Sequence, residues 1–147
     1  MSSQEKEQFN PLPASGDIVF CRFPQSVGVP GPKSRPALVV GVSKDDHAVQ
    51  VIYGTSQKTD RLYPTEILLS QSDAGFSDSG LCYATKFDTG TIVQLPFDNE
   101  WFDVAPGQMK LVPLPKMGVL HPSYMPKLIQ ASKNNKPKKR FFTQSFN

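Results

Sequence analysis

The sequence is poor in the residues that build metal centres and histidine-based active sites. Its 147 residues include two cysteines, Cys21 and Cys82, and two histidines, His47 and His121, and all four are far apart along the chain. Metal sites need clustered Cys, His or carboxylate ligands, and these spacings match no such cluster. We therefore expect no metal and no cofactor, and little support for acid–base catalysis by histidine.

Long apolar runs and phosphate-binding loops are missing as well. No apolar run approaches the roughly 18 residues of a membrane-spanning helix, and residues 1–10 lack the apolar stretch of a signal peptide. No glycine-rich loop precedes a helix, and no Gly-x-Ser-x-Gly motif is present, which disfavours nucleotide hydrolysis and serine-hydrolase chemistry. Two cysteines inside apparent strands are typical of buried, reduced thiols, so we predict a cytoplasmic protein without membrane contact.

Proline and glycine are abundant and shape the fold prediction. The 14 prolines and 10 glycines favour short strands joined by irregular loops over long helices. Apolar patterning predicts a hairpin around Asp88-Thr89-Gly90, an extended piece at Met109–Leu114 and a helix near Ser123–Ser132. The expected strands are 16–23, 35–42, 48–54, 66–69 and the hairpin arms 81–87 and 91–95. We predict a mainly β fold, a small antiparallel barrel with one or two short helices.

Charge is unevenly distributed between the body of the chain and its end. Residues 1–132 hold 11 Lys/Arg and 13 Asp/Glu, a net charge of 11 − 13 = −2, whereas residues 133–147 hold five cations and no acid. We predict three parts: a flexible arm over 1–14, one barrel domain over 15–132 and a disordered basic tail over 133–147. The tail either solubilises the chain, stacks its phenylalanines on nucleic-acid bases, or docks on the barrel.

The remaining candidates for chemistry are polar residues at strand ends. Arg35 begins an apolar strand, where its guanidinium either pairs with an acid such as Asp17 or binds a phosphate and stabilises charge on it. Hydroxyls and cations at the other strand ends serve either ordinary turn and solvation roles or contact with a polynucleotide backbone. These candidates are Thr55, Ser56, Gln57, Lys58, Lys86 and Asp88.

Three stretches occur in a fixed order along the first half of the chain. They are Gly16-Asp17-Ile18-Val19, then Arg35-Pro36-Ala37-Leu38-Val39-Val40 after a long Gly/Pro loop, and a strand ending Gly54-Thr55-Ser56. This order resembles the PemK/MazF (Kid) toxins of type II toxin–antitoxin systems, over about residues 15–97. The resemblance implies an SH3-like antiparallel barrel of the PemK/MazF/CcdB type.

The resemblance also implies an activity and partners. It implies a homodimeric endoribonuclease that cuts single-stranded RNA without a metal and is held inactive by a cognate antitoxin. The ribose 2′-OH attacks the adjacent phosphate, which leaves a 2′,3′-cyclic phosphate and a 5′-OH end. The family's active-site arginine and hydroxyl correspond to Arg35 and Thr55, with Ser56, Gln57, Lys58, Thr85, Lys86 and Asp88 as substrate contacts.

One strand departs from the family pattern. Many members carry a Ser or an Arg-x-Asp in the strand where this chain has Tyr83-Ala84-Thr85, so Tyr83 stands where some members have arginine and an acid is absent at Thr85. The competing hypothesis is therefore a barrel without catalysis that binds RNA, DNA or a protein such as gyrase. A third hypothesis is a scaffold whose tail does the binding.

Overall fold

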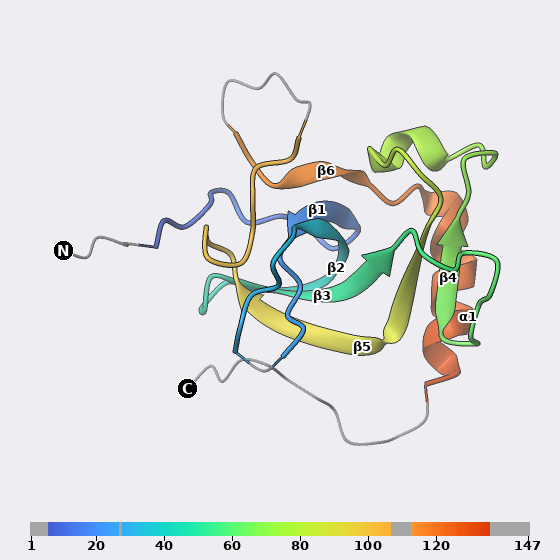
Figure 1. The fold of residues 1–147 in the computed structure, drawn as a ribbon, viewed down its shortest axis with the longest axis horizontal. Coiled ribbons are helices and arrows are strands. Elements are labelled where there is room, and N and C mark those ends of the chain that lie inside the picture. Colours follow the sequence, from blue (N-terminus) through green and yellow to red (C-terminus); the bar gives the residue numbers. More distant parts are fainter. Residues whose placement is uncertain (1–5, 27, 107–112, 136–147) are drawn as a thin grey trace.

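The computed structural model describes residues 6–26, 28–106 and 113–135 and shows one curled antiparallel sheet (Figure 1). The strands lie in the order β4-β5-β3-β2-β1-β6. Their bounds are β1 Asp17–Cys21, β2 Arg35–Ser43, β3 Ala48–Thr55, β4 Glu66–Leu69, β5 Thr85–Pro96 and β6 Lys116–Val119. The predicted mainly β fold with short helices, one near the C-terminus, is confirmed.

Successive residues of a strand point to opposite faces of the sheet, and here apolar side chains are buried on both faces. In the β1–β2 pair, Val19 lies opposite Ala37 and both belong to one apolar cluster. Their neighbours Ile18 and Leu38 form the next pair and belong to the other cluster. Near-continuous apolar runs, rather than alternation, follow from this two-sided burial.

Segments from the second half of the chain complete both clusters. A turn after β5 adds Phe97, Trp101 and Phe102 to the cluster of Val19. The other face carries the 3₁₀ turns η1 (Phe76–Ser79) and η2 (Pro122–Tyr124) and the helix α1 (Met125–Lys133), which stands beside β4 in Figure 1. The Tyr124 hydroxyl donates a 2.7 Å hydrogen bond to Asp73 and ties η2 to the loop after β4.

The prediction of a hairpin around Asp88-Thr89-Gly90 is wrong. β5 runs on in one direction, since Lys86 pairs with Thr55 and Ile92 pairs with Ile52 of the same antiparallel neighbour β3. The residues between them bulge out of the ladder, and Asp88 Oδ1 accepts a 2.8 Å hydrogen bond from the Gly90 amide. Gly-containing turn chemistry thus produces a bulge here, not a reversal of the chain.

Smaller differences concern other segments. Cys82, expected in a buried strand, is exposed in the turn before β5, whereas Cys21 is buried. β6 was not expected, and the extended piece at Met109–Leu114 lies mostly outside the described residues. Within the arm, the Phe9 amide donates to the Phe97 carbonyl at 3.0 Å. The three predicted parts stay a prediction, and residues 136–147 of the tail lie outside the described ranges.

Gly54 allows β3 to pass closely between β2 and β5. A Cβ atom on Gly54 would lie 2.5 Å from Phe87 Cε1 and 2.7 Å from the Pro36 carbonyl oxygen. Both distances are shorter than real Cβ contacts, and Phe87 is fully buried, so neither neighbour yields easily.

We expect Gly54→Ala to lower the free energy of unfolding by about 1–3 kcal/mol, because overpacking displaces Pro36 or Phe87. Gly41→Ala is the matched control on the adjacent strand β2. Its new Cβ meets the flexible end of Gln50 instead of backbone or a buried ring. Urea denaturation of both variants measures the difference; equal stabilities would contradict the steric account.

Candidate functional site

Arg35 and Thr55 come together because β2 and β3 are antiparallel neighbours. β2 begins at Arg35, β3 ends at Thr55, and the register pairs Ala37 with Tyr53. The start of one strand and the end of the next therefore meet at the same end of the sheet. Alternation along β3 puts Thr55 on the same side of the sheet as Tyr53.

A pocket of about 220 Å³ opens at this end of the sheet, and Arg35 lines it. With the residues that the structure describes, the side chain of Arg35 makes no ion pair and no hydrogen bond. Asp17, a possible partner on sequence grounds, instead lies 3.4 Å from Lys116 and accepts from the Ala14 amide. The guanidinium is therefore available to an anion. The other lining residues are Phe23, Pro24, Gln25, Lys33, Tyr53, Asp88 and Thr91.

Asp88 supplies a carboxylate to the same pocket. Its Oδ1 atom accepts hydrogen bonds from Thr65 Oγ1 at 2.9 Å and from the Gly90 amide at 2.8 Å. These bonds fix the carboxylate, and among the described residues none is made to Oδ2. A cation and an oriented carboxylate across a small pocket are the parts that phosphoryl transfer requires.

The loop that leads into Arg35 is fastened by an ion pair outside the pocket. Arg22 at the end of β1 donates to Asp103 through Nε at 3.2 Å and Nη2 at 2.8 Å. Ser34 Oγ donates to the same carboxylate, and the Gly31 amide donates to the Arg22 carbonyl at 3.1 Å. Burial raises the pKa of Asp103, but the bonds from Ser34 and Arg22 outweigh it, so the pKa lies below its ordinary value.

Thr85 and Lys86 are placed away from the pocket. Thr85 is buried, and its hydroxyl donates to the Tyr83 carbonyl at 2.8 Å. Lys86 Nζ lies 3.3 Å from Glu66 and donates to the Arg61 carbonyl at 2.9 Å, with both side chains of the ion pair about nine-tenths buried. This pair holds the loop that follows Thr55.

The residues after Thr55 form an exposed turn beside the site. Thr55 Oγ1 accepts a 3.0 Å hydrogen bond from the Gln57 amide, and Lys58 has a left-handed backbone with φ of 51°. Ser56, Gln57 and Lys58 are all exposed, so their side chains are accessible to a large ligand. None of these three residues lines the 220 Å³ pocket itself, and neither does Thr55.

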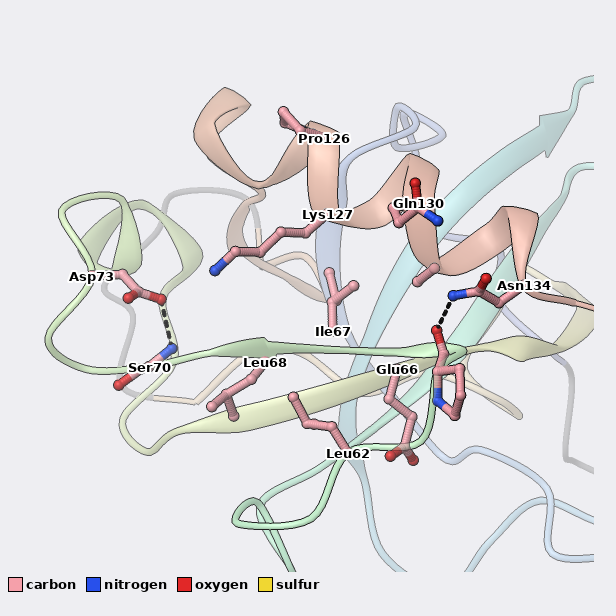
Figure 2. A pocket seen from close by; sticks show the side chains of 12 residues that line it. Leu62, Glu66, Ile67, Leu68, Ser70, Asp73, Pro126, Lys127, Gln130 and Asn134 are labelled. Atoms are coloured by element: carbon pink, nitrogen blue, oxygen red, sulfur yellow. Dashed lines mark hydrogen bonds between the residues drawn. The ribbon is translucent and has the colours of Figure 1, made fainter.

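A wider hollow of about 490 Å³ lies between β4 and α1 (Figure 2). Both carboxylates that line it already have partners within the protein. Asp73 accepts hydrogen bonds from Ser70 and Tyr124, and Glu66 forms an ion pair with Lys86. The hydrogen bonds from the Ser70 amide and from Tyr124 hold the pKa of Asp73 below its ordinary value. We therefore regard this hollow as a seam between helix and sheet and take the Arg35 pocket as the candidate site.

Two further observations bear on the kind of site. Over residues 6–26, 28–106 and 113–135, no group of three or more His, Cys, Asp or Glu side chains could hold a metal ion. In the same ranges, no helix is long and apolar enough to cross a membrane.

Several pocket residues were not singled out from the sequence. Tyr53 and Phe23 pack with ring centroids 5.1 Å apart and form one wall, and Lys33 and Thr91 also line the pocket. Tyr53 could have been identified from the sequence, because it lies two residues before Thr55 on the same strand and so faces the same side of the sheet. Phe23 and Thr91 depend on the path of the loop after β1 and on the β5 bulge, which have no clear sequence signal.

We expect Lys86→Met to lower the free energy of unfolding by about 3–5 kcal/mol, since it leaves the Glu66 carboxylate buried without a partner. The double variant Lys86→Met/Glu66→Gln should recover most of this loss. Lys44→Met, at an exposed turn, is the control and should change stability by no more than about 0.5 kcal/mol. A Lys86→Met protein as stable as the wild type would contradict the buried pair.

Asp103 should stabilise the protein in a pH-dependent way. A carboxylate whose folded pKa lies below its unfolded value contributes stability above the unfolded pKa, and the contribution is lost as the pH falls through the folded pKa. Asp103→Asn should therefore be less stable than the wild type near neutral pH, by about 1 kcal/mol or less for this half-exposed pair. The gap should close in acid, as measured by urea denaturation at a series of pH values.

Exposed Asp45, in the β2–β3 turn, provides the control for Asp103. Because its side chain is exposed, Asp45→Asn should change the free energy of unfolding by no more than about 0.5 kcal/mol. A gap for Asp103→Asn that stays constant into acid would show that the substitution acts through something other than the loss of this carboxylate.

Three solved structures that share this fold are described as endoribonucleases or a toxin from mycobacteria. An "Endoribonuclease in complex with its cognate antitoxin from Mycobacterial species" aligns with a TM-score of 0.51 at 19% identity, over 82% of this chain and 90% of that one. An "Endoribonuclease from Mycobacterial species" aligns with the same TM-score and identity, over 85% and 91%. "Mycobacterium tuberculosis toxin MazF-mt6" aligns with a TM-score of 0.51 at 17% identity, over 80% and 93%. At such identities the likeness establishes the fold.

The family is established by sequence. A search of curated proteins found no match. The family model described as "PemK-like, MazF-like toxin of type II toxin-antitoxin system" matches residues 14–96, more than half of the chain and all of β1 to β5. The chain therefore belongs to the PemK-like, MazF-like toxins of type II toxin–antitoxin systems.

Proposed function

We propose that this protein is the toxin of a toxin–antitoxin pair and cleaves single-stranded RNA, mRNA above all, at the Arg35 pocket without a metal ion. The observation that carries the proposal is that the Arg35 guanidinium, unpaired among the described residues, shares a small pocket with the Asp88 carboxylate. The family, whose members are endoribonucleases, supplies the reaction type. The ribose 2′-OH loses its proton and attacks the neighbouring phosphorus, and the bond to the 5′ oxygen breaks. The 5′ oxygen takes a proton from water, which leaves a 2′,3′-cyclic phosphate and a 5′-OH end.

In this proposal Arg35 stabilises the transition state. Negative charge accumulates on the non-bridging oxygens as the 2′ oxygen adds to phosphorus, and a planar guanidinium can donate two hydrogen bonds to them. Fixed donors of this kind cost little reorganisation when charge develops, and removing one lowers rates by about 10²–10³-fold. Lys33, exposed on the same rim, adds positive charge beside it.

Asp88 is the proposed proton acceptor. Its Oδ1 atom is held by Thr65 and Gly90, which leaves Oδ2 to take the proton of the attacking 2′-OH. An acid is missing at Thr85, where the family pattern places one, and Asp88 brings a carboxylate to the pocket from the bulge three residues later. We assign Thr55 Oγ1 to a hydrogen bond with the reacting phosphate or ribose.

Substrate contacts beyond the reacting phosphate fall to the exposed turn of Ser56, Gln57 and Lys58. Tyr53 and Phe23 offer aromatic surface on which a base can stack. Buried Thr85 and Lys86 act in this proposal through the segments they hold in place, with Lys86 restraining the loop after Thr55.

The partners follow from the family. A structural neighbour is described as an endoribonuclease in complex with its cognate antitoxin, and we propose that an antitoxin covers the Arg35 pocket here. We propose a homodimer as well, supported by Met125 and Ile129, which lie exposed four residues apart on one face of α1. We propose that the protein acts in the cytoplasm, because mRNA is found there.

Arg35→Ala should lower the rate of RNA cleavage by at least about 100-fold and leave the fold intact, because the side chain makes no bond to the described residues. The assay follows cleavage of a varied RNA pool in EDTA, with end mapping for the cyclic phosphate. Lys44→Ala, a cation at the far end of β2, is the control and should cleave like the wild type. Undiminished cleavage by Arg35→Ala would refute the assignment, and cleavage that EDTA abolishes and Mg²⁺ restores would refute metal independence.

The competing function is binding without catalysis, favoured by one observation. In many members the start of this strand carries charged residues. In this chain the corresponding residues are Tyr83, which is 70% exposed, and Thr85, which is buried. Tight RNA or gyrase binding with no new RNA ends would establish this function in place of cleavage.

A further inference from the structure

We propose that Asn135, just after α1, is a positioning residue for RNA cleavage: its side-chain amide holds the β5 bulge that carries the Asp88 carboxylate into the Arg35 pocket. The inference rests on the proposed function, in which Asp88 is the proton acceptor. It gives a role at the site to a residue outside the matched family segment, residues 14–96.

The bulge lacks the strand pairing that holds the rest of β5. Pairing with β3 stops at Phe87 and resumes at Ile92, so residues 88–91 have no partner on that strand. Two of these residues, Asp88 and Thr91, line the pocket. The position of this wall of the pocket therefore depends on hydrogen bonds made to the bulge from elsewhere in the chain.

Thr65, in the segment before β4, provides one set of these bonds. Its carbonyl accepts from the Thr89 amide at 2.9 Å and from the Thr89 hydroxyl at 2.7 Å. Its own hydroxyl donates to Asp88 Oδ1 at 2.9 Å. Thr65 thus binds the bulge from one side and the carboxylate directly.

Asn135 provides the remaining bond, from the helix. Its Nδ2 atom donates a 2.9 Å hydrogen bond to the carbonyl of Thr89, which lies between the two pocket residues of the bulge. Its backbone amide donates to the Ser132 carbonyl at 3.2 Å, which fixes Asn135 to the last turn of α1. The bulge is therefore held between the segment before β4 and the end of the helix.

The amide of Asn135 makes this bond at a cost to the fold. Its Oδ1 atom is buried and has no hydrogen-bond partner among the described residues. A buried acceptor without a partner lowers stability, and a contact that served the fold alone would be expected to satisfy both ends of the amide. The unpaired atom lies close to the carboxylate, since a Cβ atom on Gly90 would lie 3.4 Å from Asn135 Oδ1 and 3.1 Å from Asp88 Oδ1.

Asn135→Ala should lower the single-turnover rate constant for cleavage at saturating protein by at least about tenfold, because a displacement of about 1 Å at a reacting group can cost about 100-fold. The protein concentration that gives half of this rate should change by less than about twofold, since Arg35 and the exposed turn still bind the RNA. The assay uses an RNA that contains one mapped cleavage site, in EDTA.

The neighbouring Asn134 offers a matched control. Its Nδ2 atom donates a 2.8 Å hydrogen bond to the Pro64 carbonyl, drawn as a dashed line in Figure 2, so it fastens the same end of α1 without a bond to the bulge. Asn134→Ala should lose a similar amount of stability and cleave within about twofold of the wild type. Asn135→Asp keeps the size of the side chain but removes the donor, and it should be as slow as Asn135→Ala.

A double-mutant cycle separates positioning from a general loss of structure. If Asn135 acts through the carboxylate, its removal should matter little once the carboxylate is gone. In an Asp88→Asn chain, Asn135→Ala should therefore slow the residual cleavage by less than about twofold.

A measurement without RNA follows the carboxylate directly. The Gly90 amide donates to Asp88 Oδ1 at 2.8 Å, so its hydrogen exchange, read by NMR, reports whether the carboxylate stays in place. Exchange at Gly90 should be at least about tenfold faster in Asn135→Ala and unchanged in Asn134→Ala.

Three outcomes would overturn the inference: equal slowing by Asn134→Ala, a full further loss in the Asp88→Asn chain, or weaker RNA binding with an unchanged maximal rate. Cleavage by the wild type with no effect of Asn135→Ala would refute the positioning role alone. If the wild type cuts no RNA, faster Gly90 exchange in Asn135→Ala would refute the proposed function and support the hold of Asn135 on the carboxylate. Unchanged exchange in that case would refute both.

Discussion

The central strand β3 constrains the rest of the structure, because it is paired along both edges and buried on both faces. β2 and β5 hydrogen-bond to it, and Gly54 lets it run close to Pro36 and Phe87. With no free edge and no solvent face, a change of its register would expose one apolar cluster or the other. The positions of Tyr53, which lines the candidate site, and of Thr55 at the end of the strand are therefore set by the whole sheet.

The groups around Arg35 come from segments distant in sequence, and different forces hold each one. Backbone pairing places Arg35 and Tyr53, hydrogen bonds within the bulge orient Asp88, and the Arg22–Asp103 ion pair fastens the loop that carries Lys33. Because the hydrogen bonds between strands set the positions of Arg35 and Tyr53, loops at this end of the sheet can differ in sequence without moving these two residues. This arrangement agrees with low identity among chains that share the fold.

Local pattern was sufficient to predict four of the six strands and the helix, since the spacing of apolar residues and the positions of proline and glycine are read directly from the chain. β1 to β4 and α1 lie close to where they were expected. The bulge at Asp88 was taken for a hairpin, because a turn signal does not say whether the two flanking segments pair with each other or with a third strand. The buried ion pair of Lys86 with Glu66 also depends on the pairing of β4 with β5, and the identities of the two residues do not predict that pairing.

The matched family segment, residues 14–96, ends before the protein has a complete interior. Phe97, Trp101 and Phe102 fill one side of the sheet, Leu120 and Tyr124 fill the other, and β6 covers an edge of β1. The segment needed to complete the interior is thus longer than the segment that carries the residues of the candidate site. Divergence in the last third of the chain is then limited by the demands of the interior, even where sequence comparison no longer finds a relation.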